Sequence, residues 1–331
     1  MEALTVGALG EQGLLALVQS FCPAELVGDD AALLTVPAGE ALVVSSDVLV
    51  DGIHFSDRTT PPEAAGWRAA AANLSDLAAM GARPLVLTVS LSLPREQPVA
   101  WVKALYQGLA ACGEAYGAAI AGGDLSRSPT VAIAITALGT VPPTQALRRS
   151  AAQPGDVIVA TGWHGASRAG LELLLRPEAG AGLTKAAQTA LIHAHQRPRP
   201  RFDAIAHLAA LPCQRAIAAM DSSDGLADAV LQISRASGVG ARLDRAALPI
   251  PPLFTPWLAP EQALAWTLYG GEDFELVLCG PPAWGRSLVD RLGPEAAIIG
   301  SMTSEPEVLL VTADGSAPPQ ALSLGSGFQH F

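Results

Sequence analysis

Residues 73–82 read Asn-Leu-Ser-Asp-Leu-Ala-Ala-Met-Gly-Ala and end an alanine-rich stretch that starts near Thr60. The Thr-Pro-Pro-Glu sequence at that start is a capping-box pattern, and glycine follows Met80, so the stretch predicts one long helix. Asp76 lies among apolar neighbours in this helix, with Asn73 on the same face. A buried carboxylate without a partner costs free energy or takes up a proton, so we expect Asp76 to face a cation site rather than a solvated groove.

The segments around this helix mix strands and helices irregularly. Strands are predicted at 41–50, 85–93, 118–121, 130–140, 157–160, 216–220, 239–243, 274–279 and 296–300, and helices at 99–116, 203–211, 224–237, 259–268 and 282–292, with another helix ending near 175. Residues 177–200 are predicted to form a loop. The 331 residues exceed the usual size of one core, and a junction is predicted at 148–156, so we expect domains at 1–149 and 150–331. Because neither half alternates strictly between strand and helix, an α+β fold is favoured over a doubly wound sheet.

The composition predicts a sizeable apolar core, since 50% of the residues are apolar and 15% are charged, with a formal net charge of −11. Lys and Arg cluster only at 197–201, so a nucleic-acid partner is not expected. Neither Lys103 nor Lys185, the two lysines of the chain, follows a glycine, which excludes a Gly-x-x-x-x-Gly-Lys-Ser/Thr phosphate loop. The Gly-x-Gly-x-x-Gly fingerprint is missing as well. Phosphoryl chemistry would therefore depend on metal ions and arginine.

A cytoplasmic location is expected. The four cysteines are far apart in sequence and are predicted to be small buried residues in a reducing compartment (Cys22, Cys112, Cys213 and Cys279). The first residues lack the basic segment and apolar run of a signal peptide. No apolar stretch approaches the roughly 20 residues that a membrane span requires, so no membrane partner is expected.

Five further segments place an acidic residue next to glycine or serine. They are Gly28-Asp29-Asp30, Ser45-Ser46-Asp47, Gly122-Gly123-Asp124, Asp221-Ser222-Ser223-Asp224-Gly225 and Gly270-Gly271-Glu272-Asp273. Carboxylates beside exposed backbone N–H groups suit hard cations and phosphate oxygens. The glycine pairs 122–123 and 270–271 let a ligand approach the backbone, and we expect both in loops at strand ends. Each acid alone is also typical of a turn or a helix start, so the hypothesis depends on their convergence in one pocket.

Magnesium is the expected metal. It prefers oxygen ligands, is commonly shared between carboxylates and substrate phosphates, and would relieve the repulsion among gathered acids. Zinc is disfavoured because no His or Cys falls at ligand spacing, and His193 and His195 would point to different helical faces. The hydroxyls of Ser45, Ser46 and Ser223 could donate to phosphate oxygens, although turn or cap formation is as common for a single serine, and we predict that Ser223 caps the helix that follows it.

Six motifs, in order along nearly the whole chain, resemble those of the thiamine-monophosphate kinase family. They are Gly28 to Ala32, Ser46-Asp47 with Asp51 to Phe55, Asn73 to Ala82, Gly122 to Asp124, Asp221 to Leu226 and Gly270 to Leu276. The family belongs to a superfamily that includes aminoimidazole ribonucleotide synthetase and selenophosphate synthetase. The resemblance implies two domains, an N-terminal sheet that joins a second copy to form a barrel across a homodimer, and a C-terminal α/β sandwich.

The resemblance also implies the activity: ATP phosphorylates thiamine monophosphate to thiamine diphosphate with several Mg²⁺ ions. It implies metal ligands at Asp30, Ser45, Ser46, Asp47, Asp76, Asp124, Asp221 and Asp224, of which Asp76, Asp124, Asp221 and Asp224 are the expected catalytic acids. Nucleotide contacts are implied at Gly123, Asp124, Arg149 and Ser223, and contacts to the thiamine compound at His54, Glu272 and Phe328. Ser46 stands where the family usually has threonine, and Phe328 where some relatives carry a larger or more polar aromatic residue.

Phosphoryl transfer passes through a loose transition state, so we expect direct in-line attack by the ionised phosphate of the acceptor, without a general base or a phosphoenzyme. Two alternatives remain. Another ATP-using enzyme of the superfamily is disfavoured because Cys22 is followed by proline, no lysine precedes Lys103 and the chain ends in Gln-His-Phe. A non-catalytic acidic metal-binding scaffold would explain the charge but not the acids beside the glycine pairs.

Overall fold

The computed structural model describes residues 3–211, 213–312, 315 and 317–327. The chain divides into two compact units, Met1–Leu77 with Ala82–Thr144, and Ala78–Gly81 with Gln145–Phe331. The junction thus falls slightly before the expected boundary at 149/150, and Arg149 belongs to the second unit. None of the helices that the structure describes is long and apolar enough to cross a membrane.

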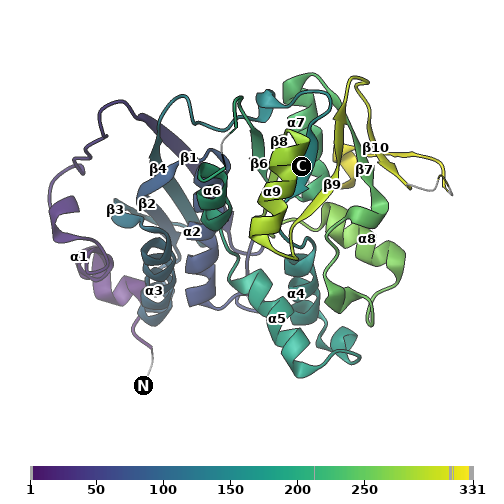
Figure 1. The fold of residues 1–331 in the computed structure, drawn as a ribbon. Helices are drawn as coiled ribbons and strands as arrows, with labels where there is room; N and C mark the ends of the chain where they lie inside the picture. The colour runs from purple at the N-terminus through teal and green to yellow at the C-terminus, as the bar shows by residue number, and fades with distance from the viewer. Residues whose placement is uncertain (1–2, 212, 313–314, 316, 328–331) are drawn as a thin grey trace. The chain divides into compact units, whose positions relative to one another are not determined.

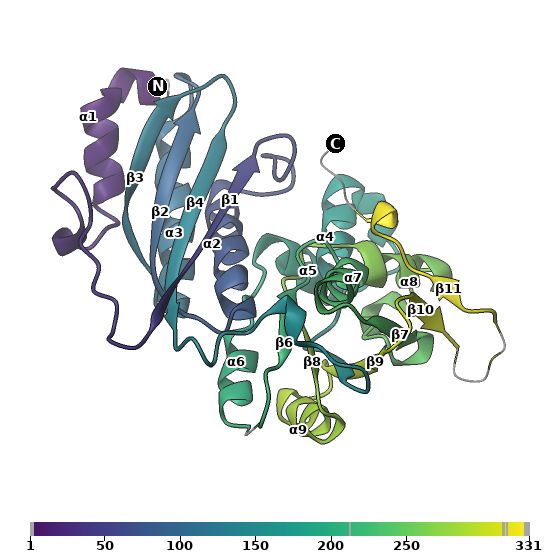
Figure 2. The same ribbon diagram turned by 90° about the horizontal axis from the view of Figure 1, so that it is seen from above.

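The first unit is built on a four-stranded sheet in the order β1-β4-β2-β3. Its strands are β1 (Ala41–Val50), β2 (Arg83–Leu93), β3 (Ala119–Arg127) and β4 (Ala132–Val141). β4 is antiparallel to both neighbours, whereas β2 and β3 are parallel because the crossover helix α3 (Val99–Tyr116) connects them. The helices α2 (Pro62–Ala79) and α3 cover one face of this sheet, and α1 (Val6–Gln19) lies beside β3 (Figures 1 and 2).

Two glycines let α2 and α3 cross in backbone contact. A Cβ added at Gly66 would lie 2.0 Å from the carbonyl oxygen of Leu105, and one at Gly108 would lie 1.8 Å from that of Glu63. The alanines of α2 are buried on several sides, as the sequence predicted for this helix, and Gly81 follows it with φ 69°. This close packing fixes the helix that carries Asp76.

The segment Gly122-Gly123-Asp124 lies inside β3, not in a loop after a strand that ends at Ala121, so the sequence prediction was wrong here. Gly123 pairs with Val89 next to a register shift in β2. A Cβ at Gly123 would lie 1.8 Å from the carbonyl oxygen of Val89, and its φ is 152°. The glycine therefore permits close strand contact at an irregularity in the ladder.

The second unit contains a seven-stranded mixed sheet in the order β11-β10-β7-β9-β5-β8-β6. The strands are β5 (Val157–Ala160), β6 (Ala218–Asp221), β7 (Gly240–Asp244), β8 (Leu276–Gly280), β9 (Ala297–Thr303), β10 (Val308–Val311) and β11 (Gln320–Ala321). Only the pair β7 and β10 is parallel among these described strands. The mixture confirms an α+β fold rather than a doubly wound sheet.

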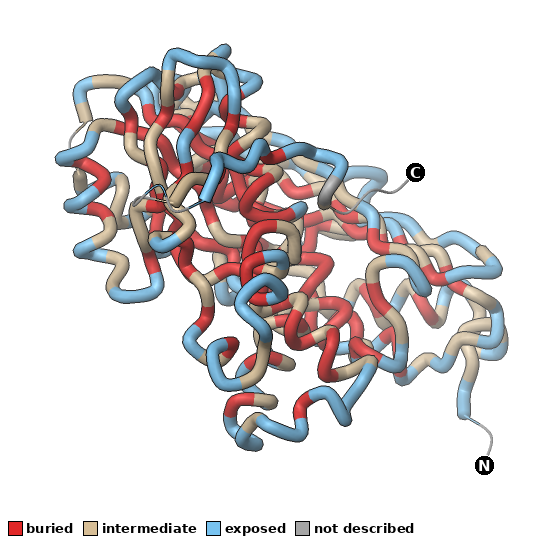
Figure 3. The backbone as a smooth tube through the Cα atoms, turned by 90° about the vertical axis from the view of Figure 1, so that its right-hand side faces the viewer, coloured by how far each residue is buried: buried red, intermediate tan, exposed pale blue. Residues whose placement is uncertain are grey.

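Both faces of this sheet are covered, and the central strands β5 and β8 carry no polar side chain apart from Cys279. Ile158 of β5 packs in a core with α7 (Leu226–Ser237) and α8 (Pro260–Tyr269). Its neighbour Val159 packs in a second core with α6 (Phe202–Ala209) and α9 (Pro282–Leu292). This is the predicted α/β sandwich, and Figure 3 shows burial concentrated in its strands and helices, with exposed connecting loops.

Several elements were not predicted. The expected loop 177–200 contains helix α5 (Lys185–Gln196), which Thr184 caps by accepting a hydrogen bond from the Ala187 backbone N–H at 3.2 Å. Helix α5 packs against α4 (Ala166–Leu175), and both contribute to a third apolar cluster around Phe254. Helix α1 and the strands β10 and β11 were also missed.

Candidate functional site

Strand β1 and helix α2 bring together two of the acidic segments. The hydroxyl of Ser45 donates to the Asp76 carboxylate, and the backbone N–H of Asp47 donates to Asn73 Oδ1 at 3.0 Å. Asn73 in turn donates through Nδ2 to the carbonyl oxygen of Ala69 at 3.0 Å. Alternation along β1 places Ser45 and Asp47 on the same face, toward the helix. Asp76 is therefore half-buried and hydrogen-bonded to Ser45, and the cation site predicted at this residue stays a prediction.

Ser46 lies on the opposite face of β1 from its neighbours. Its hydroxyl donates to the carbonyl oxygen of Ile135 at 3.0 Å and lies 3.2 Å from Thr136 Oγ1. The residue is exposed. The structure thus does not bring Ser46 together with Ser45 and Asp47, with which the sequence grouped it.

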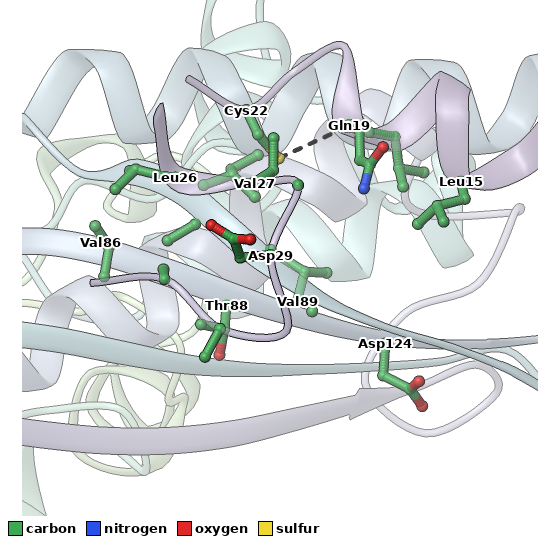
Figure 4. Close-up of a pocket in the computed structure, with 18 of the residues that line it drawn as sticks. Leu15, Gln19, Cys22, Leu26, Val27, Asp29, Val86, Thr88, Val89 and Asp124 are labelled. Carbon is green, nitrogen blue, oxygen red and sulfur yellow. Dashed lines mark hydrogen bonds between the residues drawn. The ribbon is translucent and has the colours of Figure 1, made fainter. Parts of the chain in front are cut away.

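A cavity of about 560 Å³ in the first unit lies beside the Gly28–Asp30 segment. Apolar side chains from α1, β2, β3 and the short helix Ala24–Leu26 form most of its lining. Asp29, Asp30, Gly123 and Asp124 also line it, and Figure 4 shows Asp29 and Asp124 well apart from each other. The Asp124 carboxylate accepts a hydrogen bond from Ser126 Oγ at 2.9 Å. The cavity therefore combines an apolar wall with two separate acidic edges.

His54 follows β1 in a turn that contains Gly52 with φ 82°. Its Nδ1 accepts a hydrogen bond from the Val50 backbone N–H at 3.0 Å, which places the ring proton on Nε2. The residue is half-buried. Its predicted contact with substrate stays a prediction, and Phe328, predicted for the same role, lies outside the described residues.

In the second unit, the segment Asp221 to Gly225 forms a turn between β6 and α7. Asp221 is buried and accepts a hydrogen bond from Ser223 Oγ at 3.2 Å, whereas Asp224 is exposed. Helix α7 begins at Leu226, with Gly225 at the N-cap position. The prediction that Ser223 caps this helix was therefore wrong, because its hydroxyl serves the neighbouring carboxylate instead.

The Gly270–Phe274 loop holds this turn from the other side. The backbone N–H of Glu272 donates to the Ser223 carbonyl oxygen at 2.7 Å. Glu272 and Phe274 adopt φ values of 59° and 53°, a left-handed conformation that is strained for residues other than glycine and concentrates at functional sites. Glu272 Oε2 lies 3.8 Å from His195 Nδ1. The predicted loop is confirmed. The left-handed backbone at Glu272 keeps this residue out of a regular strand.

Asp273, which was predicted only as part of this motif, supports the loop. Its two carboxylate oxygens accept hydrogen bonds from the backbone N–H groups of Gly165 at 2.6 Å and Ser167 at 2.8 Å, at the start of α4. Burial raises the pKa of Asp273 to about 7, and the nearby carboxylates of Glu275 and Glu272 act in the same direction, against the two hydrogen bonds.

Arg149 lies beside α7, with its backbone at the end of that helix. Its carbonyl oxygen accepts a hydrogen bond from Ser237 Oγ at 2.8 Å. Burial raises the pKa of Asp228, the negative charge of Asp224 raises it further, and the positive charge of Arg149 opposes the increase. The exposed Arg149 therefore contributes positive charge at Asp228, in the first turn of α7.

A buried ion-pair network, which the sequence did not predict, lies behind the Asp221–Gly225 turn and the Gly270–Phe274 loop. Arg201 donates to the Thr161 carbonyl oxygen at 2.8 Å and forms ion pairs with Glu275 and Asp203. Thr161 Oγ1 donates to Glu275 Oε2 at 2.5 Å. The sequence did show a cluster of arginines at 197–201, but the spacing of this cluster does not predict which carboxylates pair with it.

The predicted acids form three groups in the part of the chain that the structure describes: Asp47 with Asp76, the acids around the cavity, and Asp221 with Asp224 and Glu272. Among the described residues, no three His, Cys, Asp or Glu side chains already form a metal-binding cluster. The donors within each group are carboxylate and hydroxyl oxygens, the set that Mg²⁺ prefers, and phosphates supply further oxygen ligands in such sites. These residues therefore fit magnesium rather than zinc.

Comparisons with known proteins identify the family. The family model for the N-terminal domain of AIR synthase related proteins matches residues 28–141, and the C-terminal model matches 153–311. The thiamine-monophosphate kinase of Synechococcus elongatus is 54% identical, covering 100% of this chain and 99% of that protein. The chain belongs to the thiamine-monophosphate kinase family.

Solved structures of thiamine-monophosphate kinases share the fold. The crystal structure from Stenotrophomonas maltophilia is 36% identical, with a TM-score of 0.77 and coverage of 88% of this chain and 90% of that one. AaThiL complexed with AMPPCP and TMP is 30% identical, with a TM-score of 0.72 and coverage of 97% and 99%. Kinship over the full length disfavours both a non-catalytic scaffold and a different enzyme of the superfamily.

Proposed function

We propose that this chain transfers the γ-phosphoryl group of ATP to thiamine monophosphate by direct in-line attack, assisted by several Mg²⁺ ions. As a member of its family the chain is a thiamine-phosphate kinase, and the product is thiamine diphosphate. The observation that carries the assignment is the full-length match to thiamine-monophosphate kinases. The complex of the related AaThiL with AMPPCP, an analogue of ATP, and TMP supports the same pair of substrates.

The carboxylates of this chain provide sites for metal-bound phosphates. Ser45 orients the Asp76 carboxylate, and Ser223 orients that of Asp221, so these acids are positioned before a ligand arrives. Such preorganised charge is the main source of catalysis in phosphoryl transfer. When bound, Mg²⁺ would neutralise the phosphate charges that otherwise drive donor and acceptor apart. Arg149 would add positive charge next to Asp224.

The acceptor phosphate is already largely ionised near neutral pH, so the attacking oxygen needs no general base. The protein's contribution is to hold the two phosphates in line and to exclude competing orientations. Glu272 and His54 are proposed contacts to the thiamine compound. The cavity beside Gly28–Asp30 has an apolar wall and acidic edges, which suits a nucleotide with its base against the wall.

We also propose a homodimer formed through the sheet of the first unit. Strand β1 exposes Leu42, Val44 and Val48, with exposed fractions of 45%, 58% and 49%. Exposed apolar residues that follow one face of a strand are typical of an association surface. A second copy of the same sheet would cover them and would bury the edge strand that they occupy.

Incubation of the purified protein with ATP, Mg²⁺ and thiamine monophosphate tests the function. Chromatography should detect thiamine diphosphate and ADP in equal amounts, with no phosphoprotein trapped by acid quenching. Omission of Mg²⁺ serves as the control. Metal binding without any product would favour the acidic scaffold instead, and a trapped phosphoprotein would exclude direct transfer. Light scattering on the same preparation should give the mass of two chains, and a monomer would exclude the dimer.

A further inference from the structure

The Asp221–Asp224 turn depends on a buried histidine outside every motif discussed so far. His164 is fully buried between β5 and α4. Its Nδ1 lies 2.9 Å from the Gly162 carbonyl oxygen, and its Nε2 lies 3.0 Å from Ser222 Oγ. Ser222 is also buried and is the residue between Asp221 and Ser223. The imidazole therefore contacts the centre of the turn from inside the protein.

The histidine cannot easily move away from this position. Its backbone N–H donates to the Pro249 carbonyl oxygen at 3.1 Å, and its own carbonyl oxygen accepts from Thr267 Oγ1 at 3.2 Å. The adjacent Gly165 has φ 92°, and a Cβ there would lie 2.9 Å from the Trp266 backbone. The backbone of His164 is thus held at its N–H, at its carbonyl oxygen and at the following glycine.

The position of the ring proton of His164 determines the direction of the hydrogen bond to Ser222. A carbonyl oxygen only accepts, so Nδ1 carries the proton that is donated to Gly162. Burial lowers the pKa of His164 to about 4, against the hydrogen bond to Gly162, and the positive charge of Arg201 lowers it further. The ring is therefore neutral near pH 7 and Nε2 is an acceptor, so it shares the one proton of the Ser222 hydroxyl with the Glu275 carbonyl oxygen, which the same hydroxyl contacts at 3.1 Å.

This bond completes the set that shapes the turn. The Ser222 backbone N–H already donates to the Glu275 carbonyl oxygen at 2.8 Å, and the Gly225 N–H donates to the Ser222 carbonyl oxygen at 3.0 Å. The Ser222 side chain lies between two acceptors, the Glu275 carbonyl oxygen at 3.1 Å and His164 Nε2 at 3.0 Å, and His164 is the one that a substitution can change. Because Ser222 is covalently next to Asp221 and Ser223, its position fixes where the Asp221 carboxylate and its serine partner lie.

We propose that His164 is a positioning residue that holds the Asp221–Asp224 turn in its metal-binding shape through the Ser222 hydroxyl. The inference rests on the proposed function, in which this turn holds Mg²⁺. Residues behind metal ligands typically change metal affinity by roughly 10–100-fold when they are removed. His164 acts through a serine rather than on a ligand directly, so the lower end of that range is expected.

The experiment compares two amide substitutions at this position. In His164→Gln the longer amide can place an oxygen near the Nε2 position and accept from Ser222. In His164→Asn the shorter amide reaches Gly162 but not Ser222. Binding of Mn²⁺, a paramagnetic substitute for Mg²⁺, is measured by electron paramagnetic resonance in the presence of AMPPCP, so that the readout does not depend on turnover.

We expect His164→Asn and Ser222→Ala each to raise the Kd for Mn²⁺ roughly 10-fold, and His164→Gln to stay within about 3-fold of the unaltered protein. The double variant His164→Asn/Ser222→Ala should bind no more weakly than Ser222→Ala alone, because both changes remove the same bond. Ser234→Ala is the matched control, since it removes a buried hydroxyl that donates to the Val239 carbonyl oxygen away from the turn. It should lower Tm without changing the Kd.

Unchanged Mn²⁺ affinity in Ser222→Ala would overturn the proposal, even if His164→Asn failed to fold. Additive effects of the two changes would overturn it as well, since the residues would then act separately. Absence of Mn²⁺ binding by the unaltered protein with AMPPCP would instead refute the metal-dependent function, which separates the two failures.

Discussion

The tripeptide Ser-Ser-Asp occurs once in each unit, at residues 45–47 and 222–224, and the two copies do different work. In β1 the copy is paired residue by residue with β4, from Ser45 opposite Ala137 to Asp47 opposite Ile135. The side chains alternate between the two faces of the sheet. Only the first serine and the aspartate therefore face α2, where Ser45 meets Asp76.

In the second unit the same three residues form a turn, which sends each side chain in its own direction. Ser222 points inward to His164, Ser223 donates to the preceding Asp221, and Asp224 is exposed. The strand copy is held by its neighbour in the ladder, whereas the turn copy is held by a second loop and a buried histidine. The comparison shows that backbone conformation, not the tripeptide itself, decides which carboxylate each serine supports.

The largest effect is expected from one carboxylate at each copy: Asp76, which Ser45 supports, and Asp224, the last residue of the turn copy. Asp76→Asn and Asp224→Asn should each lower kcat by on the order of 10²–10³-fold, because each removes the charge of a proposed Mg²⁺ ligand. The measurement is the rate of thiamine diphosphate formation at saturating ATP and Mg²⁺. Circular dichroism and Tm should stay close to those of the unaltered protein, since both substitutions preserve size.

Unequal losses of activity in Asp76→Asn and Asp224→Asn would show which copy of the tripeptide matters for catalysis. If Asp76→Asn kept full activity while Asp224→Asn lost it, Asp76 would serve folding alone and would no longer be a proposed metal ligand. Retained activity in both variants would remove both copies from the chemistry.

A smaller effect is expected from the serine of the strand copy. Ser45→Ala removes the hydroxyl that donates to Asp76, so the carboxylate loses its orientation but keeps its charge. We expect the Mg²⁺ concentration for half-maximal activity to rise roughly 10-fold, the usual scale for residues that orient a metal ligand. Steady-state kinetics should show this higher Mg²⁺ requirement.

Ser20→Ala provides the control for this measurement. Ser20 donates to the Leu17 carbonyl oxygen at 2.6 Å at the end of α1, away from both copies of the tripeptide. It should leave the Mg²⁺ requirement unchanged. An equal shift in Ser20→Ala and Ser45→Ala would mean that general destabilisation, not orientation of Asp76, causes the loss.

Much of the fold followed from local signals in the sequence. Strand β1 was predicted at its observed bounds, and α2 ends before Gly81 as the glycine indicated. Gly238 likewise ends α7 with φ 67°. Helix α5 was missed because prolines and glycines on both sides obscured the capping threonine. Gly122 and Gly123 were misplaced because a strand interior tolerates glycine where another backbone approaches closely, and sequence alone does not show that approach.

The candidate site was predictable in its residue types but not in its contacts. Asp76 stood out because an acid in an apolar helix needs a partner, yet nothing in the spacing named Ser45 as that partner. The register of β1 and the packing of α2 determine which residue contacts Asp76. His164 gave no signal at all, since a lone histidine between two glycine-flanked turns is common, and its role depends on a contact across 58 residues of sequence.

The smallest expected effect is a pH dependence of stability that comes from Asp273, in the Gly270–Phe274 loop. This loop holds the turn copy and has no counterpart beside β1. The folded pKa of Asp273 is raised to about 7, above the 3.8 of an exposed aspartate. Between these values the unfolded chain releases a proton that the folded protein retains, so the free energy of unfolding falls as pH rises toward 7. Between pH 5.5 and 6.5 the free energy of unfolding falls by about 1 kcal/mol because of this residue.

Urea denaturation at both pH values should show this fall in the unaltered protein and not in Asp273→Asn, after the lower overall stability of the variant is subtracted. An identical pH dependence in both proteins would mean that Asp273 is ionised in the folded state, and the Glu272 loop would then be held by a charged rather than a protonated carboxyl.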